Sequence, residues 1–357
     1  MKVLSVVGAR PQFIKLAPVD RALREAGHDH IIVHTGQHYA PELSDALFAD
    51  LRIPAPDVNL AIGSATHAQQ TAAMMVGLER VFEEAAPDWV LVYGDTNSTV
   101  AAALTAVKMF LPIAHLEAGL RSGNRRMPEE HNRIVTDHVA DLLLAPTGTA
   151  MRHLAEEGLS GRSVDVGDVM TDVCFTVRDR VLASAPTMPV EWSAERGSVL
   201  ATIHRAENTD DPRRLGLILD RLDALGSQVT LVAHPRLIAR AEEFDLPLER
   251  ANLTPIASLA YSQMVYAILR ARCVVTDSGG LQKEAFLLRT PCITVRTETE
   301  WPETLVDRWN VIDPELHTDL DEHVRQARFD GDSAPFGRGD AAVRTVAAMA
   351  THESDPV

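Results

Sequence analysis

A chain of 357 residues is longer than one hydrophobic core usually supports, so its length predicts two domains. Its 46% hydrophobic and 24% charged residues are the balance of an ordinary globular protein. The formal net charge of −16 disfavours nucleic acid and anionic membranes as partners, because both would be repelled.

The sequence shows no sign of a membrane or secretory segment. No apolar run reaches the roughly 18 residues of a membrane span. The apolar start lacks a small-residue cleavage site and is interrupted by Arg10 and Lys15, so it predicts a first buried strand rather than a signal peptide. Cys174, Cys273 and Cys292 share no CxxC spacing and predict structural thiols in a reducing compartment, which favours a cytoplasmic protein.

Short β-branched runs alternate with longer amphipathic segments in the first half of the chain. The runs predict buried parallel strands at Lys2–Gly8, Ile31–Thr35, Trp89–Gly94, Ile113–Glu117 and Asp141–Ala145. The segments between them predict helices at Leu16–Ala26, Pro41–Leu51, His67–Ala85 and Thr99–Phe110. This repetition is typical of a doubly wound α/β domain.

The pattern restarts in the second half. Strands are expected at Ser198–Ile203, Gln228–Ala233, Asn252–Pro255, Cys273–Thr276 and Cys292–Arg296, again separated by helices. We expect Met170–Leu182 to cross between the halves, Ala183–Arg196 to be a surface linker, and Ala341–Ala350 to be a last helix. The sequence therefore predicts two Rossmann-like α/β domains, residues 1–170 and 171–340, facing a central cleft, with 341–357 packed back on the first.

Several common signatures are missing. The chain has no G-x-G-x-x-G, no Gly-Lys dipeptide, no HExxH and no paired CxxC. We therefore expect chemistry without NAD, without ATP hydrolysis and without a bound metal or other cofactor.

Charged residues follow the predicted strands of the first domain, at the edge where open α/β sheets bind ligands. Arg10 and Lys15 follow the first strand, Asp95 and Glu117 end two neighbouring strands, and Glu129 opens a helix. An acid in a first helical turn often only complements the helix dipole. That does not explain why neighbouring strands both end in a carboxylate, so three converging acids predict acid–base chemistry.

The second domain carries a candidate anion site. His204 lies in HRAEN after one strand, and Ser278, Gly279 and Gly280 follow another and open a helix. Glycines at a helix N-terminus expose backbone N–H groups to a phosphate. Ser-Gly-Gly alone is more often a plain turn, but beside HRAEN it predicts a diphosphate site.

Seven segments in order carry a resemblance: GARPQFIK, TGQH, YGDTNST, HLEAGLR, MPEEHNR, THRAEN with Ile203 inserted after Thr202, and TDSGGLQKEA. Together they resemble the non-hydrolysing UDP-N-acetylglucosamine 2-epimerase family, over the chain to about Asn310. The resemblance implies a fold similar to two-domain B-type glycosyltransferases, a UDP-sugar substrate and a homodimer.

The resemblance also implies residue roles. Asp95, Glu117 and Glu129 match the catalytic acids, and His204 is also expected to take part in catalysis. The expected substrate contacts are Arg10, Lys15, His204, Tyr261, Ser278, Gly279, Gly280, Glu284 and Glu300. In such enzymes Glu284 would accept hydrogen bonds from the ribose, while Arg10, His204 and the Ser-Gly-Gly backbone would hold the diphosphate.

Three segments depart from the common bacterial pattern. The first loop reads Ala-Arg-Pro-Gln-Phe, the loop before Pro128 is short, and Tyr-Ala-Pro-Glu-Leu-Ser follows TGQH. The last segment helps to build an activating UDP-sugar site in typical bacterial members, so that regulation is in doubt. The variants look like archaeal-type members and like the branch acting on UDP-2,3-diacetamido uronic acids.

The expected reaction is inversion of carbon 2 of UDP-N-acetylglucosamine by elimination of UDP to 2-acetamidoglucal and re-addition. A hydrolysing epimerase that releases N-acetylmannosamine would keep the same motifs. A B-type glycosyltransferase would need no carboxylate trio. A catalytically dead UDP-sugar sensor would be expected to have lost one of the acids.

Overall fold

The computed structural model describes residues 1–37, 53–190, 192, 197–327 and 333–352, with Arg10 described by its backbone alone. His38 of TGQH and the predicted helix at Pro41–Leu51 lie outside these residues, as does part of the predicted linker Ala183–Arg196. The chain divides into unit 1, Met1–Phe175 with Ala334–Val357, and unit 2, Thr176–Ser333.

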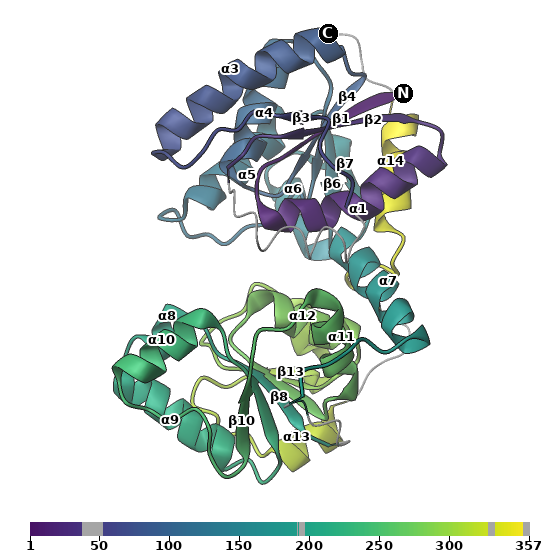
Figure 1. Ribbon diagram of the computed structural model, residues 1–357. Helices are drawn as coiled ribbons and strands as arrows, with labels where there is room; N and C mark the ends of the chain where they lie inside the picture. Colours follow the sequence, from purple (N-terminus) through teal and green to yellow (C-terminus); the bar gives the residue numbers. More distant parts are fainter. Residues whose placement is uncertain (38–52, 191, 193–196, 328–332, 353–357) are drawn as a thin grey trace. The chain divides into compact units, whose positions relative to one another are not determined.

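Parallel strands form the sheet of unit 1 (Figure 1): β1 Lys2–Val7, β2 Asp29–His34, β3 Val58–Asn59, β4 Trp89–Tyr93, β5 Ile113–Leu116, β6 Leu142–Ala145 and β7 Ser163–Asp165. The order in the described sheet is β3-β2-β1-β4-β5-β6-β7. The first strand is therefore central, and the chain reverses its direction of travel across the sheet between β1 and β4. Ligands bind at such a switch point in open α/β sheets.

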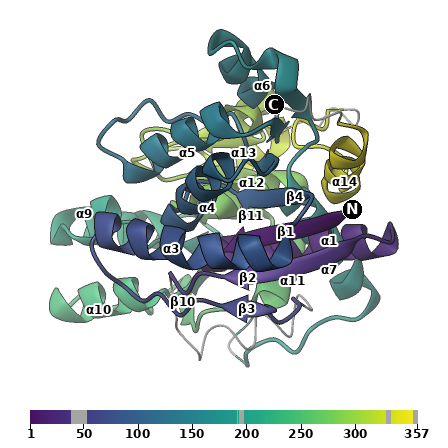
Figure 2. The ribbon, with the colours of Figure 1, turned by 90° about the horizontal axis from the view of Figure 1, so that it is seen from above.

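Helices cover both faces of this sheet. Their bounds are α1 Arg10–Glu25, α3 His67–Ala85, α4 Asn97–Lys108, α5 Pro128–Val139, α6 Gly148–Glu156 and α14 Ala341–Thr351, with a short 3₁₀ turn at Ser160–Arg162. Buried side chains of α1 and α14 share one core layer, and those of α3, α4 and α6 share the other. Figure 2 shows α3 running along β1 and β2, which it covers through Met74, Leu78 and Phe82.

Unit 2 repeats the plan with strands β8 Val199–Thr202, β9 Val229–Val232, β10 Leu253–Ile256, β11 Cys273–Thr276, β12 Cys292–Thr294 and β13 Asn310–Ile312. The order is β10-β9-β8-β11-β12-β13, so its switch point lies between β8 and β11. The helices are α8 Ala206–Thr209, α9 Pro212–Asp223, α10 Pro235–Glu243, α11 Tyr261–Arg270, α12 Gly279–Leu287 and α13 Leu320–Gln326, with a 3₁₀ segment at Pro302–Arg308. Helix α7, Val169–Ala183, belongs to unit 1 at its start and to unit 2 at its end.

The predicted strands are all present, with ends that differ by up to two residues. Helix α1 begins six residues before the predicted Leu16, because Gln12 Oε1 accepts hydrogen bonds from the N–H groups of Gly8 (2.8 Å) and Ala9 (2.9 Å) and so caps an earlier start. Within the described residues, Cys174, Cys273 and Cys292 are buried, and no helix is long and apolar enough to cross a bilayer.

Candidate active site

The loops after β1 and β4 separate at the switch point of unit 1. Gly8 begins the first of these loops and packs against Ser98 and Thr35, and a Cβ at this position would lie 2.0 Å from Ser98 Oγ and 2.3 Å from Thr35 Oγ1. Only glycine permits this close approach. The loop after β4 carries Gly94, at φ +61°, and then Asp95.

Asp95 is oriented by helix α5. Its carboxylate forms an ion pair with Arg133, and its backbone oxygen accepts a hydrogen bond of 2.9 Å from Asn132 Nδ2. The side chain of Asp95 is 29% exposed, which leaves its carboxylate open to a ligand.

Glu117 follows β5 in a left-handed conformation, at φ +72°, and forms an ion pair with Lys15. Burial alone would lower the pKa of Lys15, but the nearby charges of Glu117, Asp168 and Asp95 outweigh it and raise that pKa. Lys15 is therefore a cation with three carboxylates around it. Two of them are predicted acids, and Asp168 is a residue that the sequence did not single out.

The two acids at the start of α5 differ. Glu130 is buried, accepts hydrogen bonds of 2.9 Å from Ser122 N, Ser122 Oγ and Gly123 N, and pairs with Arg133 at 3.1 Å. Glu129 is partly buried, and its side chain has no hydrogen bond or ion pair within the described residues. Lys15 thus pairs with Glu117 and also feels the charge of Asp95, whereas no contact between Glu129 and either acid is found in that part of the chain.

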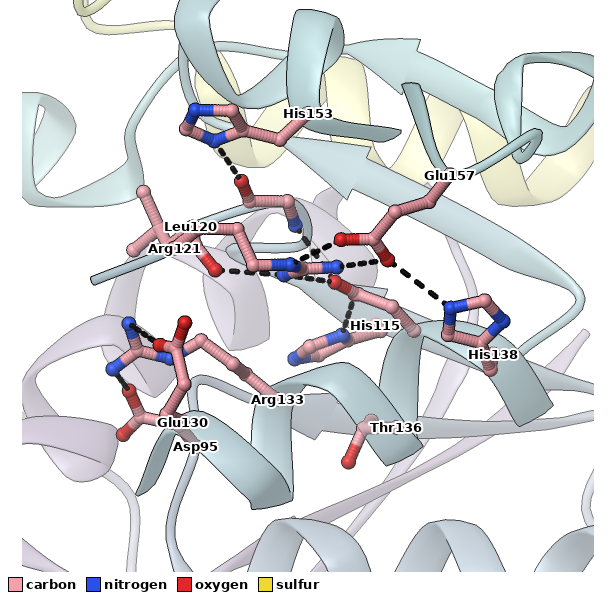
Figure 3. A network of polar contacts seen from close by, with 12 residues as sticks. Asp95, His115, Leu120, Arg121, Glu130, Arg133, Thr136, His138, His153 and Glu157 are labelled. Atoms are coloured by element: carbon pink, nitrogen blue, oxygen red, sulfur yellow. Dashed lines mark hydrogen bonds and ion pairs between the residues drawn. The ribbon is translucent and has the colours of Figure 1, made fainter. Parts of the chain in front are cut away.

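A buried polar network lies behind the acids (Figure 3). His115 of β5 contacts Asp137 Oδ1 through Nδ1 and the Gly94 carbonyl through Nε2, both at 2.7 Å. Asp137 also pairs with Arg121 at 2.7 Å, and Arg121 pairs with Glu157 at 2.7 Å. The sequence showed no signal for Asp137 or Glu157, because their partners lie far away along the chain.

Unit 1 also holds a cavity of about 650 Å³, the size of a small-molecule site. It is bounded by the first turns of α3 and α4 and by the start of α5. Its lining residues are His67, Ala68, Thr71, Ala72, Met75, Asn97, Val100, Arg125, Arg126, Pro128, His131 and Asn132. Among the described residues, no cluster of His, Cys, Asp and Glu side chains is suited to hold a metal ion.

The switch point of unit 2 brings His204 next to Asp277. The buried Asp277 carboxylate accepts hydrogen bonds from the N–H groups of His204 (3.0 Å) and Arg205 (2.9 Å) and lies 3.2 Å from His204 Nδ1. Burial raises the pKa of Asp277, but His204, the Arg205 N–H and Asn208 outweigh it and hold that pKa low. The His204 ring is thereby fixed at Nδ1, and its side chain is 35% exposed.

The Ser-Gly-Gly segment begins helix α12 as predicted. Ser278 is the N-cap, with its Oγ accepting from Leu281 N at 3.4 Å, and Gly279 and Gly280 are the first helical residues. A helix start of this kind presents N–H groups and a positive dipole end to an anion. The side chain of Arg10 lies outside the described part, so its place at a diphosphate stays a prediction.

Two further acids are Glu284, which lies in α12, and Glu300, which lies near its start. Burial raises the pKa of Glu284 to about 7, against a hydrogen bond from Tyr261 and the charge of Lys283. Glu300 pairs with Arg296 at 2.6 Å and with Arg205 at 3.4 Å, and a Cβ at Gly279 would lie 3.3 Å from its Oε2. Glu300 and the two arginines therefore border the anion site. Arg296 was not predicted.

Comparison with known proteins decides the family. The protein-family model described as UDP-N-acetylglucosamine 2-epimerase matches residues 21–350. The chain belongs to the UDP-N-acetylglucosamine 2-epimerase family. The predicted family, the α/β fold class and the assignment to the isomerases are confirmed.

Individual relatives cover nearly the whole of this family member. It is 43% identical to a Pseudomonas aeruginosa UDP-2,3-diacetamido-2,3-dideoxy-D-glucuronate 2-epimerase over 96% of the chain and 98% of the relative. It is 41% identical to a UDP-N-acetylglucosamine 2-epimerase homolog of Methanococcus maripaludis, over 97% and 98%. The crystal structure of Methanocaldococcus jannaschii UDP-GlcNAc 2-epimerase with UDP-GlcNAc and UDP aligns with a TM-score of 0.82 at 35% identity, over 99% and 100%.

Proposed function

We propose that this epimerase inverts carbon 2 of a UDP-N-acetylhexosamine, converting UDP-N-acetylglucosamine to UDP-N-acetylmannosamine without releasing the sugar. The observation that carries the proposal is the pair of acids, Asp95 and Glu117, around Lys15 at the switch point of a member of this family. We also propose that it works in the cytoplasm, as a homodimer.

The proposed chemistry is elimination and re-addition. The bond between carbon 1 and the UDP oxygen breaks while a carboxylate takes the proton of carbon 2, which yields 2-acetamidoglucal and UDP. Asp95 and Glu117 are oriented by cations to accept this proton, and Glu129, without a side-chain partner within the described residues, is available to return one. UDP then adds back to carbon 1, so no atom is lost and no oxidant is needed.

In this mechanism unit 2 stabilises the leaving diphosphate. The N-terminus of α12 and His204 supply its donors, and Arg10 of unit 1 is a further predicted donor. Preorganised donors act most strongly where charge develops in the transition state. Glu284 is assigned to the ribose hydroxyls. The proposed acids belong to unit 1, and the α12 N-terminus and His204 belong to unit 2.

A second candidate substrate is the UDP-linked 2,3-diacetamido uronic acid named for the Pseudomonas relative. The observation that favours it is the cavity in unit 1, which carries Arg125 and Arg126 beside Pro128, the residue before Glu129. Two guanidinium groups are suited to a sugar carboxylate, which UDP-N-acetylglucosamine lacks.

The first prediction tests the reaction with both sugars, each followed by proton NMR in deuterium oxide. We expect a mixture of two carbon 2 epimers, both deuterated at carbon 2 and both still attached to UDP. Added NAD should change nothing. Free sugar accumulating with stoichiometric UDP would instead establish the hydrolysing reaction, and the higher kcat/KM of the two substrates would identify the sugar.

A further inference from the structure

One buried histidine outside the mechanism above contacts the turn that carries a proposed acid. His115 lies in β5 with its side chain 0% exposed, and its two ring nitrogens contact Asp137 Oδ1 and the Gly94 carbonyl oxygen, each at 2.7 Å. Figure 3 shows the ring within the network that includes Arg121 and Glu157.

Both of these contacts need a proton on the ring. A carbonyl oxygen only accepts hydrogen bonds, and so does an ionised carboxylate. Burial raises the pKa of Asp137, but His115 and Arg121 outweigh it and hold that pKa below its usual value, so the carboxylate is ionised. The His115 ring therefore donates from Nε2 to Gly94 and from Nδ1 to Asp137.

Gly94, whose carbonyl oxygen accepts the hydrogen bond from His115 Nε2, lies against the second proposed acid, Glu117. A Cβ at Gly94 would lie 3.1 Å from Glu117 Oε2 and 3.8 Å from Lys15 Nζ, and the Gly94 N–H donates to Leu116 O at 3.0 Å. Asp95 is the next residue after Gly94. A shift of the Gly94 backbone would therefore move Asp95 relative to the Glu117–Lys15 pair.

Asp137, the other partner of the His115 ring, holds the turn after β5 in place. Asp137 Oδ2 accepts a hydrogen bond of 3.1 Å from Gly119 N and pairs with Arg121 at 2.7 Å. Gly119 has φ +82° and follows Glu117 by two residues. The pair of His115 and Asp137 thus connects the turns that carry both acids.

We propose that His115 is a positioning residue, whose Nε2–H to the Gly94 carbonyl fixes Asp95 at its working distance from Glu117. The proposal rests on the proposed function, in which these two carboxylates serve the same substrate. In this role His115 contacts neither the substrate nor the side chain of Asp95 or Glu117.

Two amide substitutions separate the two contacts. Gln places its Nε2 near the position of His Nε2, so His115→Gln keeps a donor for Gly94 and gives up the one for Asp137. Asn places its Nδ2 near His Nδ1, so His115→Asn keeps the Asp137 contact and gives up the one to Gly94. We expect His115→Asn to lose about 100-fold in kcat, as displaced catalytic groups do, and His115→Gln to stay within a few-fold of the parent enzyme. UDP affinity should be unchanged in both, because His204, Glu284 and the N-terminus of α12 belong to unit 2 and neither contact of the His115 ring involves Arg10.

The matched control is His30 in the same unit. Its side chain is also 0% exposed, with Nδ1 2.7 Å from Asp20 Oδ1 and Nε2 2.8 Å from Ser5 Oγ. His30→Gln and His30→Asn measure what an amide costs at a buried, carboxylate-bonded histidine that touches neither acid. They should lower the melting temperature as the His115 variants do, with kcat nearly unaffected.

Crystal structures of the two His115 variants give a readout that does not need activity. The Gly94–Asp95 turn should be displaced, and the Asp95–Arg133 ion pair lost, in His115→Asn but not in His115→Gln. Equal turnover in both variants, or a larger loss in His115→Gln, would overturn the proposal. An undisplaced turn in His115→Asn would do the same. A parent enzyme that epimerises no UDP-sugar would refute the proposed function instead, and the displacement would still decide the positioning role.

Discussion

Neighbouring carboxylates of this protein are held in different ways, and this separates supporting groups from reacting ones. Glu130 accepts three hydrogen bonds from the Ser122–Gly123 loop, whereas the side chain of the adjacent Glu129 has no partner in the described part of the chain. Asp277 is similarly occupied by the His204–Arg205 backbone. Acids already saturated with donors shape the loops, and those with exposed oxygens are left for a substrate.

Glu284 provides a prediction about pH. Burial raises its pKa to about 7, from 4.5 in an unfolded chain. Its contribution to folding stability is therefore fully present below pH 4.5 and is lost as the pH rises through about 7. Ionised Glu284 is the better acceptor for ribose hydroxyls, so we expect UDP to bind the parent protein more tightly at pH 8 than at pH 6.

The Glu284→Gln variant serves as the comparison. Its UDP affinity, measured by calorimetry, should lack the part of the pH dependence that Glu284 causes, and its melting temperature should fall less than that of the parent between pH 5 and pH 8. Any dependence caused by His204 remains in both proteins and cancels in the difference. Identical pH profiles for the two proteins would exclude Glu284 from the nucleotide site.

At the scale of elements, the sequence predicts what local patterns determine. Helix α3 has the predicted bounds His67–Ala85, since Thr66 caps its start and Ala86 ends it in a left-handed conformation. Strands β3, β7 and β13 were not predicted, because they have two or three residues each and β3 and β7 are only partly buried. Pairing with a neighbouring strand, rather than hydrophobic pattern, defines such short edge strands.

The same limit applies to the site. The candidate residues Asp95 and Glu117 follow strands of unit 1, and His204 and Ser278 follow strands of unit 2, so the sheet edge on which each pair lies is readable from the sequence. Their partners are not readable in this way. Arg133 reaches Asp95 across 38 residues and Lys15 reaches Glu117 across 102. Local spacing in the sequence does not predict such pairs, because they form only through tertiary packing.

The last helix provides a second prediction about pH. Asp172 of α7 accepts hydrogen bonds from the N–H groups of Ala341 (3.1 Å) and Ala342 (2.8 Å), and so caps α14. Burial raises the pKa of Asp172 to about 6, with Asp340 and Asp168 adding to the rise and the two N–H bonds opposing it. Its contribution to stability is thus fully present below pH 3.8 and is lost as the pH rises through about 6.

We expect Asp172→Asn to remove this contribution and keep one oxygen for the cap. Thermal melts between pH 4 and pH 7 should show a smaller decline for the variant than for the parent. Asp172→Ala, which leaves both N–H groups without that acceptor, should lower the melting temperature at every pH. If Asn and Ala behave alike, the carboxylate does not act as a cap.

On the scale of the whole molecule, the two units follow one plan and supply different chemistry. Each has its first strand in the centre of a parallel sheet, and each places polar loops at the carboxyl ends of its switch-point strands. In unit 1 the loop after β4 carries Asp95 and the loop after the neighbouring β5 carries Glu117, and in unit 2 the switch-point loops carry His204 and the N-terminus of α12. Proton transfer and nucleotide binding are therefore assigned to separate units, and substitutions should affect them separately.

This separation leads to the last prediction. Asp95→Asn, Glu117→Gln and Glu129→Gln keep the size of each side chain but remove its proton-transfer function. Each should lower turnover about 100- to 10,000-fold, with UDP affinity within a few-fold of the parent. His204→Ala and Glu284→Ala should weaken UDP binding in calorimetry, because a lost charge-assisted hydrogen bond costs about 10- to 150-fold in affinity. Glu130→Gln is the matched control on α5. Since Glu130 holds the Ser122–Gly123 loop, its amide should lower the melting temperature more than Glu129→Gln does, while the carboxylate next to it retains its function. If the three acid variants kept near-normal turnover, or lost UDP affinity as strongly as His204→Ala, the carboxylate mechanism would have to be abandoned.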